Sequence, residues 1–155
     1  MNNLDLQQLL TQAQELGDEE VELFYEQSTQ NDLEIYDNQV ESLESAQEKG
    51  LGIRVFLADQ MGFAYTSNFA DQALEEVIEE AISNADVASE DENRTLPAGE
   101  FSYPQLDIYN SALAETEIED KIDLALEMEA AALDYSEQIK SVTSVNYGDY
   151  DAEVQ

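Results

Sequence analysis

GLGIRVFLADQMGFAYTSN, the stretch from Gly50 to Asn68, decides the fold. Its first half alternates between aliphatic side chains and small, charged or aromatic ones, which is the pattern of a strand with one buried face. The sequence ADQMG then predicts a turn, in which we expect Gly62 to take a positive φ angle. A β-hairpin is therefore predicted, and the rest of the chain should pack against it. Its aliphatic face consists of Leu51, Ile53, Val55 and Leu57.

Three helices and further strands are predicted around this hairpin. The helices carry apolar residues at helical spacing and run over 4–16, 71–85 and 116–135. Shorter alternating runs predict strands at 21–27, 33–36, 40–48, 139–147 and 150–155. Polar turns are expected at 28–32, 37–38 and 148–149. The order of elements predicts an α+β fold, with a mainly antiparallel sheet of about five to seven strands and three packed helices.

Local details of this arrangement also follow from the sequence. Asn68 is expected to be the N-cap of the second helix, and Thr116–Glu119 reads as a capping box for the third. The strand at 40–48 alternates weakly, which suits a sheet edge. Residues 87–105 form a long acidic connector that contains both prolines.

The chain length fits a single N-terminal domain over residues 1–155. The sequence stops within the strand predicted at 150–155, so we expect a fragment of a longer chain. There is no secretory signal at the N-terminus and no apolar run of membrane-spanning length, so a cytoplasmic protein is predicted without membrane contact.

The charge is extreme, with 37 acidic residues against five basic ones and a net charge of −32. Such a chain repels phosphate backbones, so direct nucleic-acid binding is not expected. The bland interpretation is a solvated acidic surface that keeps the protein in solution. The crowded carboxylates should also make the fold more stable when salt is added.

Most catalytic constellations are excluded because the chain contains no histidine and no cysteine. A Ser-His-Asp triad, a His-Glu-x-x-His zinc helix and a thiol nucleophile therefore cannot be built. Gly50 and Gly52 lack the third glycine of a phosphate loop and are better explained as close-packing positions. The acidic run Ser89–Asn93 offers weak oxygen ligands for Ca²⁺ or Mg²⁺, but it lacks the Asp-x-Asp-x-Asp-Gly spacing of an EF-hand, and a solvated loop is the better explanation. No catalytic, cofactor-binding or metal residue is assigned.

Two other features deserve a functional and a structural interpretation. Arg54 projects from the most apolar strand, and it either bridges to a cross-strand glutamate such as Glu44 or Glu48 or anchors a carboxylate of a partner. Eight tyrosines either lie half-buried in the sheet or line a groove for sugars or peptides; they include Tyr103, Tyr109, Tyr147 and Tyr150.

The sequence resembles the N-terminal region of the TldD/PmbA family, whose members are also called modulators of DNA gyrase and are classed as metallopeptidases. The resemblance covers nearly the whole chain, and its most specific part is the opening stretch at 50–68. The matching segments are VELFY at 21–25, NQVESLE at 38–44, GLGIRVF at 50–56, GFAYTS at 62–67, LDIY at 106–109 and SVNYG at 144–148. The subgroup is closer to PmbA, also called TldE, than to TldD.

The resemblance implies a dimer, either a homodimer or a heterodimer with a TldD-type subunit, that degrades extended peptides or unfolded proteins. TldD-type subunits carry a His-Glu-x-x-x-His zinc motif, and PmbA-type subunits lack it. No ligand of that motif occurs in these 155 residues. Zinc, if the full complex holds it, would lie downstream, and the fragment alone should be inactive.

Three functions remain in competition at this point. The first is a non-catalytic N-terminal domain of a PmbA-like metallopeptidase subunit, which contributes to the substrate cavity and to dimer assembly. The second is a stand-alone acidic module that binds proteins or peptides without proteolysis. The third, a hydrolase that uses its own carboxylates, is the weakest because no pair of carboxylates stands out. A gene that continues well past Gln155 would favour the first over the second.

Overall fold

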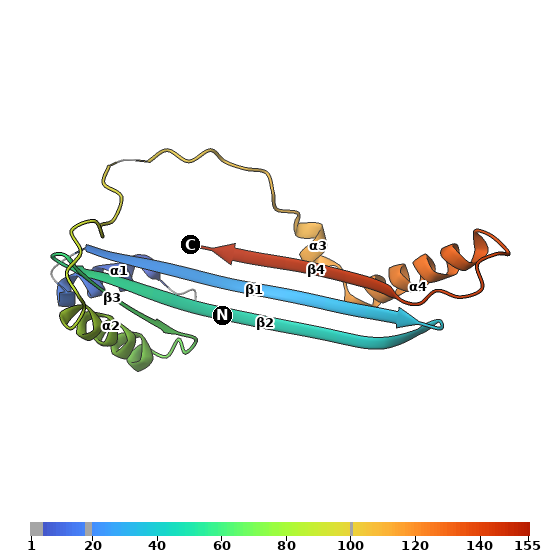
Figure 1. Cartoon of the computed structure of the whole chain (residues 1–155), viewed down its shortest axis with the longest axis horizontal. Coiled ribbons are helices and arrows are strands. Elements are labelled where there is room, and N and C mark those ends of the chain that lie inside the picture. Colours follow the sequence, from blue (N-terminus) through green and yellow to red (C-terminus); the bar gives the residue numbers. More distant parts are fainter. Residues whose placement is uncertain (1–4, 18–19, 100) are drawn as a thin grey trace. The chain divides into compact units, whose positions relative to one another are not determined.

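The computed structural model describes residues 5–17, 20–99 and 101–155, which form helices and a sheet (Figure 1). The helices are α1 (Leu6–Gly17), α2 (Asp71–Asp86), α3 (Ser111–Glu115) and α4 (Ile118–Asp134). The strands are β1 (Glu20–Tyr36), β2 (Gln39–Leu57), β3 (Gln60–Thr66) and β4 (Val145–Val154). They pair in the order β3-β2-β1-β4. The predicted α+β class with an antiparallel sheet is confirmed.

The strands are fewer and longer than predicted, because expected breaks lie inside them. The turn predicted at 28–32 belongs to β1, the turn at 148–149 belongs to β4, and 40–57 is continuous within β2. Polar residues stay in a strand when neighbouring strands satisfy their backbone groups and their side chains reach solvent. Residues 41–49 of β2 are exposed at every position, which meets that condition. The predicted number of strands was therefore too high, because short polar segments were taken as breaks between strands.

The turn predicted at 37–38 is confirmed and joins β1 to β2. Asp37 and Asn38 have φ angles of 50° and 57°. Two successive positive φ angles are typical of the type I′ turn, whose twist matches that of the strands it connects. Aspartate and asparagine tolerate this conformation better than most residues, so the local sequence accounts for the position of this hairpin.

The chain divides into two compact units, each described by itself. Unit 1 consists of residues 1–27, 49–102 and 153–155, and unit 2 consists of residues 28–48 and 103–152. A single domain over 1–155 stays a prediction. None of the described helices is long and apolar enough to span a membrane.

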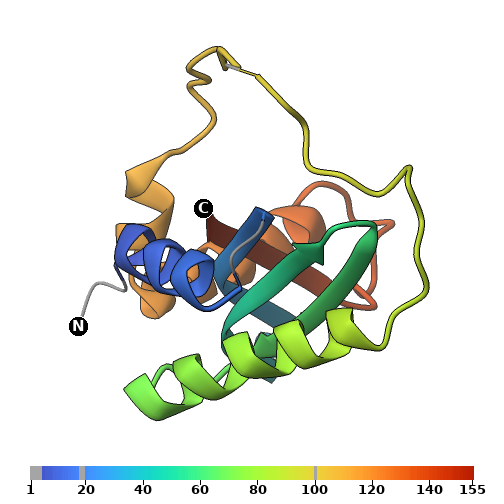
Figure 2. The ribbon, with the colours of Figure 1, turned by 90° about the vertical axis from the view of Figure 1, so that its left-hand side faces the viewer.

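Unit 1 has its core between one face of the sheet and the helices α1 and α2, which lie beside the strands in Figure 2. The opening stretch supplies the sheet side of this core, because Leu51, Ile53 and Val55 are at most 1% exposed. Strands β2 and β3 pair antiparallel, with Leu51 opposite Thr66 and Leu57 opposite Gln60. The helices contribute Leu9, Ala13, Leu74, Val77, Ile78 and Ala81. The predicted hairpin and its aliphatic face are thus confirmed.

Gly62 has a different role from the predicted one. A positive φ angle occurs at Ala58 (50°) in the turn, whereas Gly62 lies in β3 without one. A Cβ atom added at Gly62 would overlap the carbonyl oxygen of Ala81 and the backbone nitrogen of Ala85. The glycine is therefore required because α2 approaches β3 closely, not because of the turn.

Both predicted helix caps are wrong in detail. The N-cap of α2 is Ala70, and the Asn68 side chain instead accepts a hydrogen bond from the Ala70 N–H at 3.1 Å. The N-cap of α4 is Glu117, with no side-chain cap. The Thr116 hydroxyl donates to the Ala112 carbonyl at 2.6 Å, because the unpredicted one-turn helix α3 ends there and offers an unpaired acceptor.

Unit 2 packs α4 against its segments of β1 and β4. The buried residues of this smaller core are Leu33 and Ile35 from β1, Ala125 from α4 and Val145 from β4. Between α2 and α3, the described residues of the connector form no helix or strand. Its first part is held by a backbone hydrogen bond from Asp91 to Asp59 at 2.7 Å and by the Gln60 side chain, which donates to the Ala88 carbonyl at 2.7 Å.

Candidate functional site

The buried face of α4 is the most unusual polar feature of unit 2. Lys121, Ala125 and Glu129 follow one another at intervals of four residues, so they lie on one side of the helix. All three are buried, with exposed fractions of 5%, 0% and 3%. Charged side chains are rarely this buried unless partners compensate the lost hydration. The stripe therefore directs attention to what Lys121 and Glu129 contact.

Lys121 forms a buried ion pair with Asp149 of β4, and the two charged atoms lie 2.9 Å apart. The side chains are 6% and 8% exposed. Asn31 of β1 donates a second hydrogen bond to the carboxylate at 2.8 Å, and Tyr147 bonds to it as well. The cluster joins β1, β4 and α4 through one carboxylate.

The titration of this cluster follows from its geometry. Burial alone raises the pKa of the Asp149 carboxyl, but hydrogen bonds from Asn31, Lys121 and Tyr147, together with the Lys121 charge, lower that pKa below its ordinary value. Burial raises the pKa of Tyr147, and its hydrogen bond to the Asp149 carboxylate adds to the increase. At neutral pH the aspartate is therefore charged and the tyrosine is protonated.

Glu129 binds the tip of the β1–β2 hairpin. Its two carboxylate oxygens accept hydrogen bonds from the backbone N–H groups of Asp37 at 3.1 Å and Asn38 at 2.7 Å. The type I′ turn points these adjacent N–H groups in a similar direction, which suits a bidentate anion. The carboxylate thus attaches α4 to the hairpin and is engaged within unit 2.

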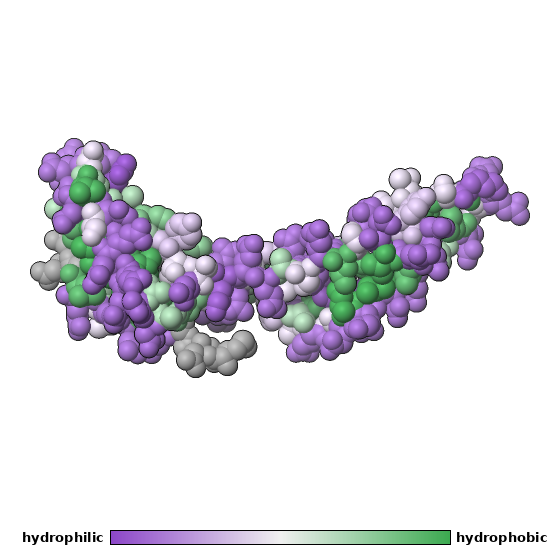
Figure 3. Space-filling view, turned by 90° about the horizontal axis from the view of Figure 1, so that it is seen from below, coloured by the Kyte–Doolittle hydropathy of each residue, from purple (hydrophilic) through white to green (hydrophobic). Residues whose placement is uncertain are grey.

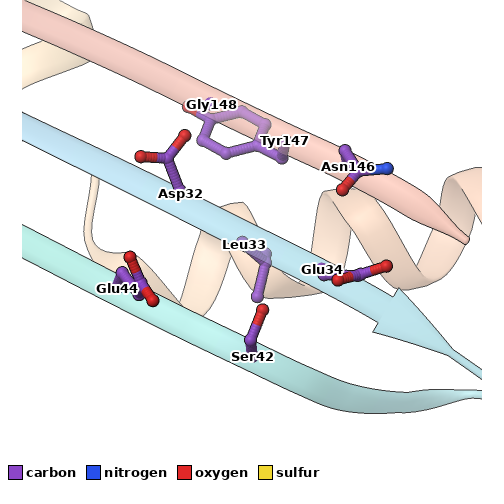
Figure 4. A pocket seen from close by; sticks show the side chains of 8 residues that line it. All are labelled: Asp32, Leu33, Glu34, Ser42, Glu44, Asn146, Tyr147 and Gly148. Atoms are coloured by element: carbon purple, nitrogen blue, oxygen red, sulfur yellow. The ribbon is translucent and has the colours of Figure 1, made fainter.

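A shallow hollow lies beside these strands, with a volume of about 320 Å³. Figure 4 shows side chains from β1, β2 and β4 around it, including three carboxylates. Its lining consists of Asp32, Leu33, Glu34, Ser42, Glu44, Asn146, Tyr147 and Gly148. Among the described residues no three acidic side chains are grouped closely enough to hold a metal ion. The hollow can offer polar contacts but shows no catalytic pair.

Unit 1 carries the second candidate surface, on the side of its sheet opposite α1 and α2. We call this surface the open face. Residues on it alternate with core residues, and three of its aromatic members are half or more exposed: Phe24 by 53%, Phe63 by 51% and Tyr65 by 76%. Phe56, which the alternation of β2 puts on the same face, is only 5% exposed, so the part of the face next to the β2–β3 turn is covered. The rings of Phe63 and Tyr65 are stacked, with centroids 6.4 Å apart. By this alternation the open face comprises Glu20, Glu22, Phe24 and Glu26 of β1, Gly50, Gly52, Arg54 and the buried Phe56 of β2, and Met61, Phe63 and Tyr65 of β3.

Arg54 lies on the open face and forms the predicted salt bridge to a glutamate of a neighbouring strand, although that glutamate is neither Glu44 nor Glu48. Its partner is Glu22 of β1, at 3.0 Å. Glu44 and Glu48 belong to the same continuous strand as Arg54, so a separation of six or more residues puts them about 20 Å or more along β2. The error came from dividing β2 into two strands.

The other predicted candidates do not form a site. In the Ser89–Asn93 run, Asp91 accepts hydrogen bonds from Asn93, and these contacts lower its carboxyl pKa. Arg94 adds an ion pair to Asp91 at 3.3 Å. Of the four tyrosines named for a groove, only Tyr147 lines the hollow; Tyr103 and Tyr109 lie exposed between α2 and α3. The buried polar cluster was missed, although Lys121 inside an apolar helix stripe was a usable indication.

The donor set of this chain does not fit a zinc site. Zinc in proteins is usually held by histidine and cysteine, often with a carboxylate, and the chain has neither of the first two. Carboxylates are plentiful, and Figure 3 shows hydrophilic residues over much of the surface seen there. Among the described residues, however, no three carboxylates lie close enough together to hold a metal ion. The arrangement can bind and position other groups through carboxylates, aromatic rings and strand edges.

Comparison with known proteins places this arrangement in a family. The family model described as PmbA/TldA metallopeptidase domain 1 matches residues 21–85, and the model of the PmbA/TldA metallopeptidase central domain matches residues 112–155. Together they cover more than half of the chain. The chain belongs to the TldD/PmbA metallopeptidase family. The resemblance noted in the sequence is thereby confirmed.

Individual relatives agree with this assignment. A metalloprotease PmbA homolog from Haemophilus influenzae is 28% identical over 115 residues, which is 72% of this chain and 25% of that protein. A candidate modulator of a DNA gyrase from Thermotoga maritima has a similar fold, with a TM-score of 0.82 and 20% identity over 96% of this chain and 33% of the other.

Two further solved structures share the fold. A candidate modulator of DNA gyrase from Bacteroides thetaiotaomicron has a TM-score of 0.78 and 24% identity, covering 99% of this chain and 36% of the other. TldE from Thermococcus kodakarensis has a TM-score of 0.72 and 17% identity, covering 96% and 34%. This TldD/PmbA-family chain therefore spans about a quarter to a third of the length of the relatives described here.

Proposed function

We propose that this chain is a non-catalytic part of a PmbA-like subunit in a metallopeptidase complex. The observation that carries the proposal is the combination of family membership with a sequence that has no histidine and no cysteine. In this proposal the chain shapes the substrate cavity and the dimer contact, while the metal and the reaction belong to other residues. The partner is a second PmbA-like subunit or a TldD-type subunit.

The sheet supports a role in holding extended peptides. In the order β3-β2-β1-β4, the outer strands β3 and β4 each leave one edge without a described neighbour. Such an edge can accept a peptide as an additional strand, with backbone hydrogen bonds giving affinity and side chains giving specificity. Extended or unfolded peptides are therefore the proposed substrates, and a cytoplasmic setting without nucleic-acid or membrane contact remains part of the proposal.

The test uses the purified chain with and without a TldD-type subunit from the same organism. Alone, the chain should hydrolyse no unstructured peptide and bind no stoichiometric zinc, as measured by atomic emission after gel filtration. With the catalytic subunit it should co-elute and alter peptide turnover. Tight zinc binding or peptidase activity of the chain alone would refute the proposed division of labour.

The alternative of a stand-alone acidic module makes a different prediction for the same experiment. Such a module would not co-elute with a TldD-type subunit and would leave its turnover unchanged. Reading the gene beyond codon 155 gives an independent criterion, because an immediate stop codon favours the module. A reading frame that continues for several hundred codons favours the peptidase subunit.

A further inference from the structure

The open face of unit 1 combines exposed aromatic rings with negative charge. Phe24, Phe63 and Tyr65 occupy two strands on either side of β2. Three glutamates of β1 lie on the same face, against the single guanidinium of Arg54. Aromatic rings next to carboxylates are the combination that attracts lysine and arginine side chains, through the ring quadrupole and through charge.

The glycine at position 52 makes room for the Phe63 ring on this face. A Cβ atom at Gly52 would lie 3.1 Å from the Phe63 ring, so the absence of a side chain lets the ring lie against the backbone of β2. One side of the ring thereby contacts the strand while about half of its surface remains exposed. A ring held in this way loses little further freedom when a ligand contacts it, which favours binding.

Unit 1 already contains a contact of this kind at another place. The ammonium group of Lys49 lies 4.5 Å from the centre of the Phe69 ring. That pair occurs within the chain and uses one of its five basic residues. On the open face Arg54 is the basic residue that could contact the rings, and its guanidinium is already engaged with Glu22.

We infer that the open face binds an extended peptide that carries arginine or lysine side chains, which lie against Phe24, Phe63 and Tyr65. A cationic occupant is chosen because the chain has a net charge of −32 and the face itself is net negative. A second copy of the chain is disfavoured for the same reason, since two such faces repel each other. The choice of an extended peptide, but not the cationic preference, rests on the proposed function.

The test measures direct binding, so it does not depend on catalysis. The probe is a fluorescein-labelled peptide of four Arg-Thr repeats, and binding to the purified chain is followed by fluorescence anisotropy at about 0.15 M NaCl. A second peptide replaces each arginine by citrulline, which has nearly the same shape but no charge. The arginine peptide should bind and the citrulline peptide should bind far more weakly.

Variants separate the aromatic contacts from the general attraction of an acidic protein. Phe63→Ser combined with Tyr65→Ser should raise the Kd for the arginine peptide about fivefold or more. The control combines Tyr109→Ser with Tyr135→Ser, which removes two exposed aromatic rings from unit 2 at the same net charge. The control should change the Kd less than about twofold.

A third variant gives a gain of affinity that misfolding cannot imitate. Arg54→Gln removes a competing cation and releases Glu22, so the arginine peptide should bind roughly two- to fivefold more tightly. The inference is wrong if the double variant and the control weaken binding equally, or if Arg54→Gln leaves the Kd unchanged. Self-association of the chain that depends on Phe63 and Tyr65 would also contradict it. Loss of peptidase activity in the family complex would leave this binding result untouched.

Discussion

Replacing Gly62 by alanine tests whether the close approach of α2 to β3 determines the packing of unit 1. The added Cβ would overlap backbone atoms of Ala81 and Ala85, which cannot rotate away as a side chain could. Because non-bonded carbon atoms prefer separations of about 3.5–4.0 Å, α2 must move by roughly 1 Å or more to accommodate the methyl group. That movement loosens the contacts of Leu74, Val77 and Ile78 with the sheet.

The expected cost is about 3 kcal/mol of unfolding free energy, at the upper end of overpacking effects. Gly50→Ala is the matched control, because its Cβ meets only the Thr66 carbonyl oxygen at an ordinary distance of 3.9 Å. The control should be neutral or stabilising by about 0.5–1 kcal/mol, as alanine restricts the unfolded chain. Urea unfolding followed by circular dichroism measures both. Equal midpoints for the two variants would show that α2 yields without strain and would refute this account of Gly62.

Four further predictions concern unit 2 and the overall charge. Lys121→Met leaves the Asp149 carboxylate buried without its cation and should cost about 3–5 kcal/mol in urea unfolding. Burial raises the pKa of the Asp149 carboxyl, but its hydrogen bonds and the Lys121 charge lower the pKa in the folded state below 3.8. The charged carboxylate therefore stabilises the fold above pH 3.8, and this stabilisation is lost as the pH falls through the folded pKa. The stability difference between the wild type and Asp149→Asn should therefore be constant near neutral pH and shrink below about pH 4. Glu129→Gln replaces one acceptor oxygen of the hairpin contact by a donor and should cost about 2 kcal/mol, with faster amide exchange at Asp37 and Asn38. Raising NaCl from about 0.01 M to about 1 M shortens the Debye length from about 30 Å to about 3 Å and should raise the Tm; an unchanged Tm would mean that carboxylate repulsion is unimportant.

Periodicity predicted the elements whose pattern is set by burial. The alternation from Leu51 to Val55 and the helical stripe of α2 both reflect one apolar face against a core, and both are present in the structure. Phe56 departs from the alternation, because it is buried outside that core. The Asp37–Asn38 turn was predicted because its backbone conformation depends on those two residues themselves. Local physical chemistry was sufficient in these cases.

The errors share a different cause, which is pairing between distant segments. Ser28–Asp32 and Gly148–Asp149 have turn-forming residues, yet Asn31 and Asp149 contact each other across β1 and β4. A sequence read in short windows cannot show that a neighbouring strand will satisfy those polar groups. The same limitation hid the candidate site, because the partners of Lys121 and Glu129 lie 28 and about 90 residues away along the chain.

The buried charged groups of unit 2 serve packing. The buried charges Lys121, Glu129 and Asp149 are all engaged with partners inside unit 2, and these contacts attach α4 to β4 and to the β1–β2 turn. A catalytic acid or base needs the opposite arrangement, in which a perturbed group faces the substrate. The rings of the open face are different, because half or more of the surface of Phe24, Phe63 and Tyr65 is exposed to solvent. Grouped apolar surface of this kind on a protein often marks an interaction site. An occupant that covers them would gain the interaction that the chain itself leaves unused, which makes this face the first place to look for a bound peptide.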